Sequence, residues 1–98
     1  LHPQVKPTSL PFDVEGRPLI LIDDVLFTGR TTRAAINELF DYGRPASIKL
    51  AVLADRGDRE LPICAEFCAW KVSLADNQEL VLETTPDGKL QWRCDEHA

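Results

Sequence analysis

LILIDDVLFTGRT, residues 19–31, is the stretch that decides how this chain folds. Its aliphatic first part is typical of a parallel β-strand that is buried on both faces. Asp23 and Asp24 follow directly, and then comes a loop that contains Thr28 and Gly29. Two neighbouring carboxylates repel each other, so we expect a binding partner that interacts with both of them.

The residues on either side of this stretch predict a strand, a helix and a second strand. The first strand is predicted over 18–22 and the second over 47–55, which ends in a carboxylate. Between them, Thr31 or Thr32 offers a helix N-cap, and Gly43 offers a left-handed C′ position. Apolar side chains recur at helical spacing inside this helix, at Ala35, Ile36, Leu39 and Phe40. The order predicts a right-handed βαβ unit.

The rest of the chain predicts one more strand and a hairpin. A polar loop over 56–63 precedes a third strand over 65–72, and an Asp-Gly turn within 86–89 separates two strand-like runs. The proline-rich start of the chain predicts an extended leading segment. We therefore predict an α/β fold with a mostly parallel sheet, a flanking helix and a C-terminal β-hairpin. Its parts are the leading segment (1–17), the βαβ core (18–55) and the loop, strand and hairpin (56–98).

Composition and charge exclude several classes of protein. The 98 residues form one small domain with a net charge of −5, which argues against a protein that binds nucleic acid through a basic surface. No apolar run approaches the ~18 residues of a membrane span, and no secretory leader is visible. Three cysteines fit free thiols in a reducing compartment better than a disulfide framework. We therefore expect a cytoplasmic protein without a membrane partner.

The opening stretch has the chemistry of a binding site. Ligands of parallel α/β sheets bind at the carboxyl ends of the strands, where Asp23 and Asp24 are predicted to lie. The following loop leads into a helix N-terminus, whose N–H groups and dipole bind anions. Gly29 lets the backbone approach a ligand closely. The stretch thus offers acceptors for hydroxyl groups beside a cradle for phosphate, which is the shape of a ribose 5-phosphate.

Other interpretations of these residues exist. An aliphatic strand that ends in acids also occurs in ATPases, but the sequence lacks the phosphate loop GxxxxGK[ST]. A purely structural acidic turn is a second alternative. Four further residues have spacings found in zinc sites: Cys64, Cys68, Cys94 and His97. Scattered thiols explain them more simply, so we predict no metal site built from protein side chains alone.

Residues 19–31 closely resemble the phosphoribosyl pyrophosphate (PRPP) motif of type I phosphoribosyltransferases. The stretches GRPASIKLAVLADRG (43–57) and RELPI (59–63) also resemble the PyrR family, which combines uracil phosphoribosyltransferase activity with RNA-binding control of pyrimidine operons. The resemblance covers roughly residues 10–72 well. It implies a partial type I phosphoribosyltransferase fold, in which 18–55 is the PRPP-binding core.

The resemblance also implies an activity and its residues. Uracil and PRPP would give UMP and pyrophosphate, with Mg²⁺ bound mainly through PRPP. Asp23 and Asp24 would be the catalytic acids that bind the ribose hydroxyls. Together with them, the PRPP and phosphate contacts would be Val25, Leu26, Phe27, Thr28, Gly29, Arg30, Thr31 and Thr32. Members of the family form homo-oligomers, so we expect the same of the full-length protein.

Three further residues bear on base specificity and on RNA binding. Asp55, Arg56 and Arg59 are candidates for contacts with the base or with RNA. Asp58 and Trp70 stand where the family often carries a His and a Lys, which argues against binding to leader mRNA. Two alternatives remain open, namely an RNA-binding attenuator that senses UMP or PRPP, and a purine phosphoribosyltransferase.

Family domains are nearly twice as long as this chain. The resemblance therefore implies that residues 1–98 are the C-terminal portion of a phosphoribosyltransferase domain. No stretch resembles the family's pyrophosphate loop or its catalytic lid, so we expect this chain alone to be inactive.

Overall fold

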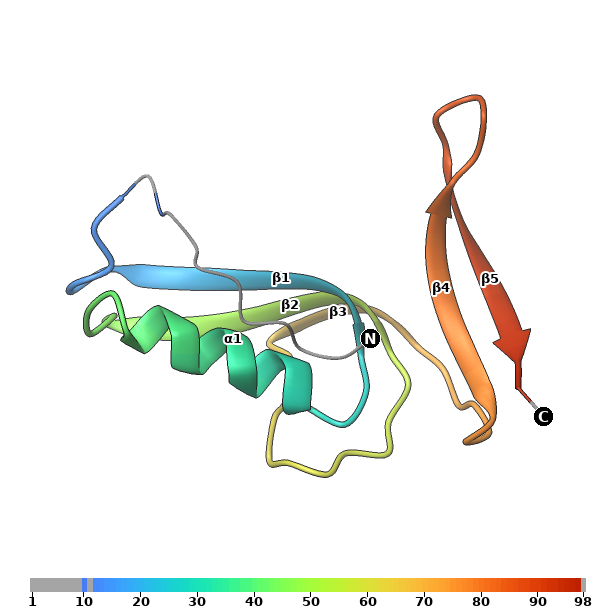
Figure 1. Cartoon of the computed structure of the whole chain (residues 1–98), viewed down its shortest axis with the longest axis horizontal. Helices are drawn as coiled ribbons and strands as arrows, with labels where there is room; N and C mark the ends of the chain where they lie inside the picture. The colour runs from blue at the N-terminus through green and yellow to red at the C-terminus, as the bar shows by residue number, and fades with distance from the viewer. Residues whose placement is uncertain (1–9, 11, 98) are drawn as a thin grey trace.

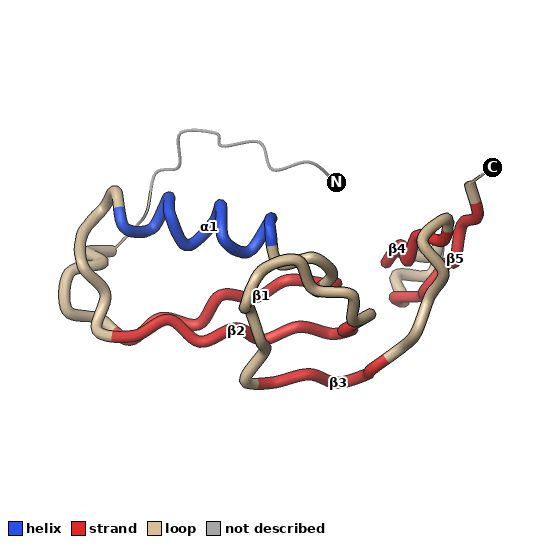
Figure 2. The backbone as a smooth tube through the Cα atoms, turned by 90° about the horizontal axis from the view of Figure 1, so that it is seen from below, coloured by secondary structure: helices blue, strands red, loops and turns tan. Residues whose placement is uncertain are grey.

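A parallel three-stranded sheet carries the fold in the computed structural model. Strands β1 (Pro18–Leu26), β2 (Ser47–Asp55) and β3 (Phe67–Lys71) pair in the order β1-β2-β3. Helix α1 (Arg30–Phe40) connects β1 to β2 and lies along one face of the sheet (Figures 1 and 2). The predicted α/β fold with its βαβ unit is therefore confirmed.

Strand β1 differs from its prediction in length and in burial. It runs on to Leu26 and so includes both acids, which we expected just beyond its end. The prediction that β1 is buried on both faces is wrong, because Ile20 is 61% exposed and Ile22 is 77% exposed. Among the described residues a single helix packs on the sheet, so only the face toward α1 is covered.

The core lies between that covered face and α1. Leu26, Leu50 and Val52 are its buried centre. Partly buried side chains pack around them: Leu21, Ile63, Ala65 and Cys68. Burial of apolar surface stabilises a fold by about 25 cal/mol per Å², so this small cluster holds together β1, β2, β3 and the 63–65 segment.

Both ends of α1 differ from the predicted caps. Gly29 is the N-cap, with a left-handed φ of 94°, and no side chain caps the helix. Thr31 and Thr32 instead lie in its first turn. At the other end Asp41 is the C-cap, so Gly43 falls one residue beyond the predicted C′ position. The glycine before the helix can adopt the left-handed conformation that the sharp exit from β1 requires.

The predicted C-terminal hairpin is present as a separate two-stranded sheet. Strands β4 (Gln78–Thr84) and β5 (Leu90–Glu96) pair antiparallel, with Thr84 opposite Leu90 (Figure 1). The ring of Trp92 lies 5.9 Å from that of Trp70, centroid to centroid, and so joins the hairpin to β3. Aromatic contacts at this distance are favourable, so this ring pair helps to hold the hairpin beside β3.

The structure describes residue 10 and residues 12–97, so most of the predicted leading segment over 1–17 lies outside the described residues. Val14 in its described part is buried, with 1% exposure. Within the described ranges, no helix has the length and apolar character needed to cross a membrane.

Candidate functional site

A cavity of about 450 Å³ lies at the carboxyl end of β1. Asp23 and every residue from Val25 to Thr32 line it. Asp24, although predicted with them, is exposed and is not among the lining residues. The structure thus brings nearly all of the predicted PRPP residues to one cavity.

The two adjacent acids have different surroundings. The carboxylate of Asp23 accepts a hydrogen bond from the Asp24 N–H at 2.8 Å, and that of Asp24 accepts one from the Val25 N–H at 2.8 Å. Partial burial, and after it the adjacent carboxyl group of Asp24, raise the pKa of Asp23 to about 6. A ligand that donates hydrogen bonds would relieve this repulsion.

The loop that follows is closely packed and needs a glycine. Gly29 has a φ of 94°, and a Cβ atom there would lie 2.9 Å from Cγ1 of Ile63. The backbone N–H of Arg30 donates to Oγ1 of Thr28 at 3.2 Å. The N–H groups of Thr31 and Thr32 have no partner among the described residues. A helix N-terminus with free N–H groups at a cavity wall is suited to an anion.

Arg56, a candidate for base or RNA contact, also lines the cavity but is only 5% exposed. Its guanidinium donates to the carbonyl oxygens of Gln78 at 2.8 Å and Ala75 at 3.1 Å. The same group lies 3.8 Å above the centre of the Phe27 ring. Its Nε has no partner among the described residues. Arg56 therefore joins the hairpin and the residues before it to Phe27, which lies in the loop that lines the cavity.

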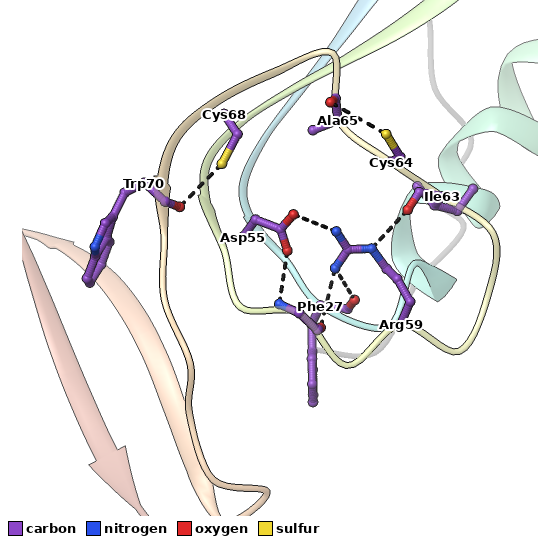
Figure 3. Close-up of polar contacts among 9 residues, drawn as sticks. Phe27, Asp55, Arg59, Ile63, Cys64, Ala65, Cys68 and Trp70 are labelled. Atoms are coloured by element: carbon purple, nitrogen blue, oxygen red, sulfur yellow. Dashed lines mark hydrogen bonds and ion pairs between the residues drawn. The ribbon is translucent and has the colours of Figure 1, made fainter.

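Asp55 and Arg59, the other two candidates, lie outside the cavity and bind each other (Figure 3). Nη2 of Arg59 lies 2.6 Å from Oδ2 of Asp55. The hydrogen bond from Arg59 lowers the pKa of Asp55 below its usual value. Arg59 also donates to the carbonyl oxygens of Phe27 and Ile63. Most of its donors are thus taken by the protein itself.

Sequence reasoning missed the contribution of the hairpin. Glu79 and Leu80 of β4 complete the cavity wall. No motif marks these two residues, and their position depends on how the hairpin docks. The anchor for that docking is Arg56, whose burial and carbonyl contacts could not be inferred from the sequence alone.

The cysteines remain free thiols. Cys64 and Cys94 are exposed and Cys68 is half-buried. The described part of the chain holds no group of three or more His, Cys, Asp or Glu side chains arranged to bind a metal ion. The zinc interpretation of Cys64, Cys68, Cys94 and His97 therefore finds no support among the described residues.

Comparison with known proteins defines the class. Residues 1–85 match the phosphoribosyl transferase domain, so the chain belongs to the phosphoribosyl transferase domain family. Among solved structures it is similar to a hypoxanthine-guanine-xanthine phosphoribosyltransferase, with a TM-score of 0.58 and 28% identity. That match covers 67% of this chain and 41% of the other.

Curated relatives are more specific. The chain is 58% identical over 88 residues to the bifunctional protein PyrR of Ralstonia nicotianae, covering 90% of this chain and 51% of the relative. It is also 58% identical over 87 residues to the bifunctional protein PyrR of Nitrosococcus oceani, covering 89% of this chain and 49% of the relative. The chain thus spans about half the length of the curated relatives it matches.

Proposed function

We propose that this chain is the nucleotide-binding portion, residues 1–98, of a uracil phosphoribosyltransferase that converts uracil and PRPP to UMP and pyrophosphate. The observation that carries the proposal is the shared cavity, where Asp23 lies beside a helix N-terminus with free N–H groups. A ribose 5-phosphate needs both features. The similarity to proteins named PyrR favours uracil as the base.

The proposed mechanism relies on positioning and electrostatics. Asp23 and Asp24 accept hydrogen bonds from the ribose hydroxyls, and the 28–32 segment binds the 5′-phosphate. Their negative charge then stabilises the positive charge that develops on the ribose as pyrophosphate leaves. Asp23, with a pKa of about 6, is mostly ionised at neutral pH, as this role requires. No protein nucleophile is needed.

Mg²⁺ fits this site only as a companion of PRPP. Mg²⁺ in proteins keeps several waters and is held by one or two carboxylates together with substrate phosphates. Asp23 and Asp24 are such carboxylates, whereas the described residues hold no complete protein cage. When bound, the ion would neutralise charge on the departing pyrophosphate.

Control of a pyrimidine operon is the second candidate function, because the relatives are named bifunctional. Two observations weigh against it here. The chain carries a net charge of −5, and Arg59 is held by protein groups. We therefore place the transferase first.

We also propose that the full-length protein forms a homo-oligomer. A cytoplasmic location is proposed as well, and it agrees with the three free thiols.

A transferase assay tests the proposal. The chain should be assayed with radiolabelled uracil and PRPP, both alone and completed by the other half of the Ralstonia nicotianae relative. We expect UMP only from the completed protein, since leaving-group stabilisation needs donors beyond this cavity. Hypoxanthine and guanine serve as competing bases. Turnover by the chain alone, or a preference of the completed protein for a purine, would contradict the proposal.

A further inference from the structure

Residues 59–63, which we call the brace, hold the cavity loop, residues 27–29, through hydrogen bonds to its carbonyl groups. The carbonyl of Phe27 accepts a hydrogen bond from Nη1 of Arg59 at 2.8 Å (Figure 3). The carbonyl of Thr28 accepts two, from the N–H groups of Glu60 at 2.9 Å and Leu61 at 3.0 Å. Two successive loop carbonyls are therefore directed toward the brace.

The directions of these carbonyls determine those of the N–H groups. In a trans peptide the C=O and the following N–H point in opposite directions. With the carbonyls of Phe27 and Thr28 turned to the brace, the N–H groups of Thr28 and Gly29 turn away from it. Both residues line the cavity. N–H groups that turn away from the brace at residues lining the cavity are available to an anion that binds there.

Arg59 also stabilises the conformation of the brace through its own hydrogen bonds. Its Nε donates to the carbonyl of Ile63 at 2.9 Å, closing the segment on itself. Its Nη2 lies 2.6 Å from the carboxylate of Asp55, the last residue of β2, and its side chain is only 23% exposed. Gly57 and Asp58, directly before Arg59, both have left-handed φ values, 75° and 53°.

The ion pair between Arg30 and Glu60 joins the same two segments but contributes less. Its N···O distance is 2.6 Å, yet both side chains are more than half exposed. Exposed pairs of this kind are worth little. Arg59, with its partly buried partners, is therefore the main side-chain support of the loop.

We propose that Arg59 is a positioning residue, which holds the 27–29 loop in the conformation that binds a phosphate monoester. The inference rests on the proposed function, because it assigns a support to the phosphate part of that site. Arg59 acts through the loop and does not touch the ligand. A lysine cannot replace it, because one ammonium group cannot reach acceptors on Phe27, Ile63 and Asp55 in three directions.

A titration of the intact chain with ribose 5-phosphate, monitored by NMR, tests this inference. We expect Arg59→Ala and Arg59→Lys to weaken binding at least tenfold, and Asp55→Asn to weaken it less. Arg93→Ala is the matched control, since Arg93 also contacts two carboxylates, on Glu83 and Asp95, but lies on the hairpin. It should leave the dissociation constant unchanged.

Amide hydrogen exchange without ligand supplies the second readout. In Arg59→Ala the amides of Glu60 and Leu61 should lose protection, whereas those of β2 should keep it. If Arg59→Ala binds ribose 5-phosphate as the wild type does, or if Arg93→Ala weakens binding equally, the inference is wrong while the proposed function stands. If the wild-type chain binds no ribose 5-phosphate, the proposed function fails, and the inference with it.

Discussion

The carboxyl group of Asp23 lies half-buried beside a second carboxyl group, and its pKa is raised to about 6 by that burial and by Asp24. A carboxyl group with a raised pKa in the folded state holds its proton more tightly there than in the unfolded chain. Its contribution to stability is therefore fully present below the ordinary pKa of 3.8. That contribution is lost as the pH rises through about 6.

This linkage predicts a difference in pH dependence between the wild type and Asp23→Asn. Between pH 4 and pH 7 the free energy of unfolding of the wild type should fall by about 1 kcal/mol relative to the variant, after allowing for partial exposure. Denaturant unfolding at a series of pH values measures it. Parallel curves for the two proteins would show that Asp23 titrates normally.

Gly29 is the second residue whose role can be isolated. Gly29→Ala would place a Cβ 2.9 Å from Cγ1 of Ile63, in addition to the strain of a left-handed alanine. Gly88→Ala is the matched control, because Gly88 has a φ of 84° and nothing lies within 4 Å of its added Cβ. We expect Gly88→Ala to cost about 1 kcal/mol and Gly29→Ala about 1–3 kcal/mol more. Equal losses in chemical denaturation would mean that the loop is not packed on the brace.

At the scale of elements, the sequence predicted β2 to the residue and placed α1 and the hairpin correctly. The aliphatic run and the helical spacing of apolar residues are local signals, which explains this success. The end of β1 was less predictable, because Asp23 and Asp24 look like loop residues, whereas Asp23 pairs with Val52 of β2 and the strand continues to Leu26. The predicted N-cap of α1 was wrong because Gly29, with a left-handed φ of 94°, precedes the helix and Thr31 and Thr32 lie inside its first turn.

The docking of the hairpin gives an element-scale prediction. Arg56→Ala would remove the donors to Ala75 and Gln78 and uncover Phe27. Hydrogen bonds to charged groups contribute about 1.5–3 kcal/mol, so we expect a loss of at least 2 kcal/mol in unfolding free energy. Tryptophan fluorescence should shift to the red, because Trp92 would leave Trp70. An unchanged emission maximum would show that the hairpin docks without Arg56.

At the scale of the whole molecule, local signals are not sufficient. The aliphatic run of β1 predicted burial on two faces, whereas within the described part of the chain a single helix covers one face. Glu79 and Leu80 reach the cavity only because the hairpin packs beside β3. Both features depend on how the elements of the chain are assembled. The acid pair and its loop, in contrast, form one strand–loop–helix unit that the sequence describes well.

Charge distribution over the molecule gives a prediction about RNA. With a net charge of −5 and with Arg59 occupied, we expect weak binding to pyrimidine leader RNA. Fluorescence anisotropy over a series of salt concentrations measures both the affinity and the number of phosphate contacts. Nanomolar binding near physiological salt that UMP strengthens would show that the regulatory function dominates.

The central claim is that the acids and the loop at the end of β1 bind the two ends of one ribose 5-phosphate. An NMR titration of ribose 5-phosphate into the wild-type chain and into the double variant Asp23→Asn, Asp24→Asn tests it most directly. We expect the amides of 24–32 to shift together in the wild type. The double variant should stay folded and bind more than tenfold more weakly, since each lost charged hydrogen bond is worth about 1.5–3 kcal/mol. Unchanged affinity in the double variant would contradict the claim.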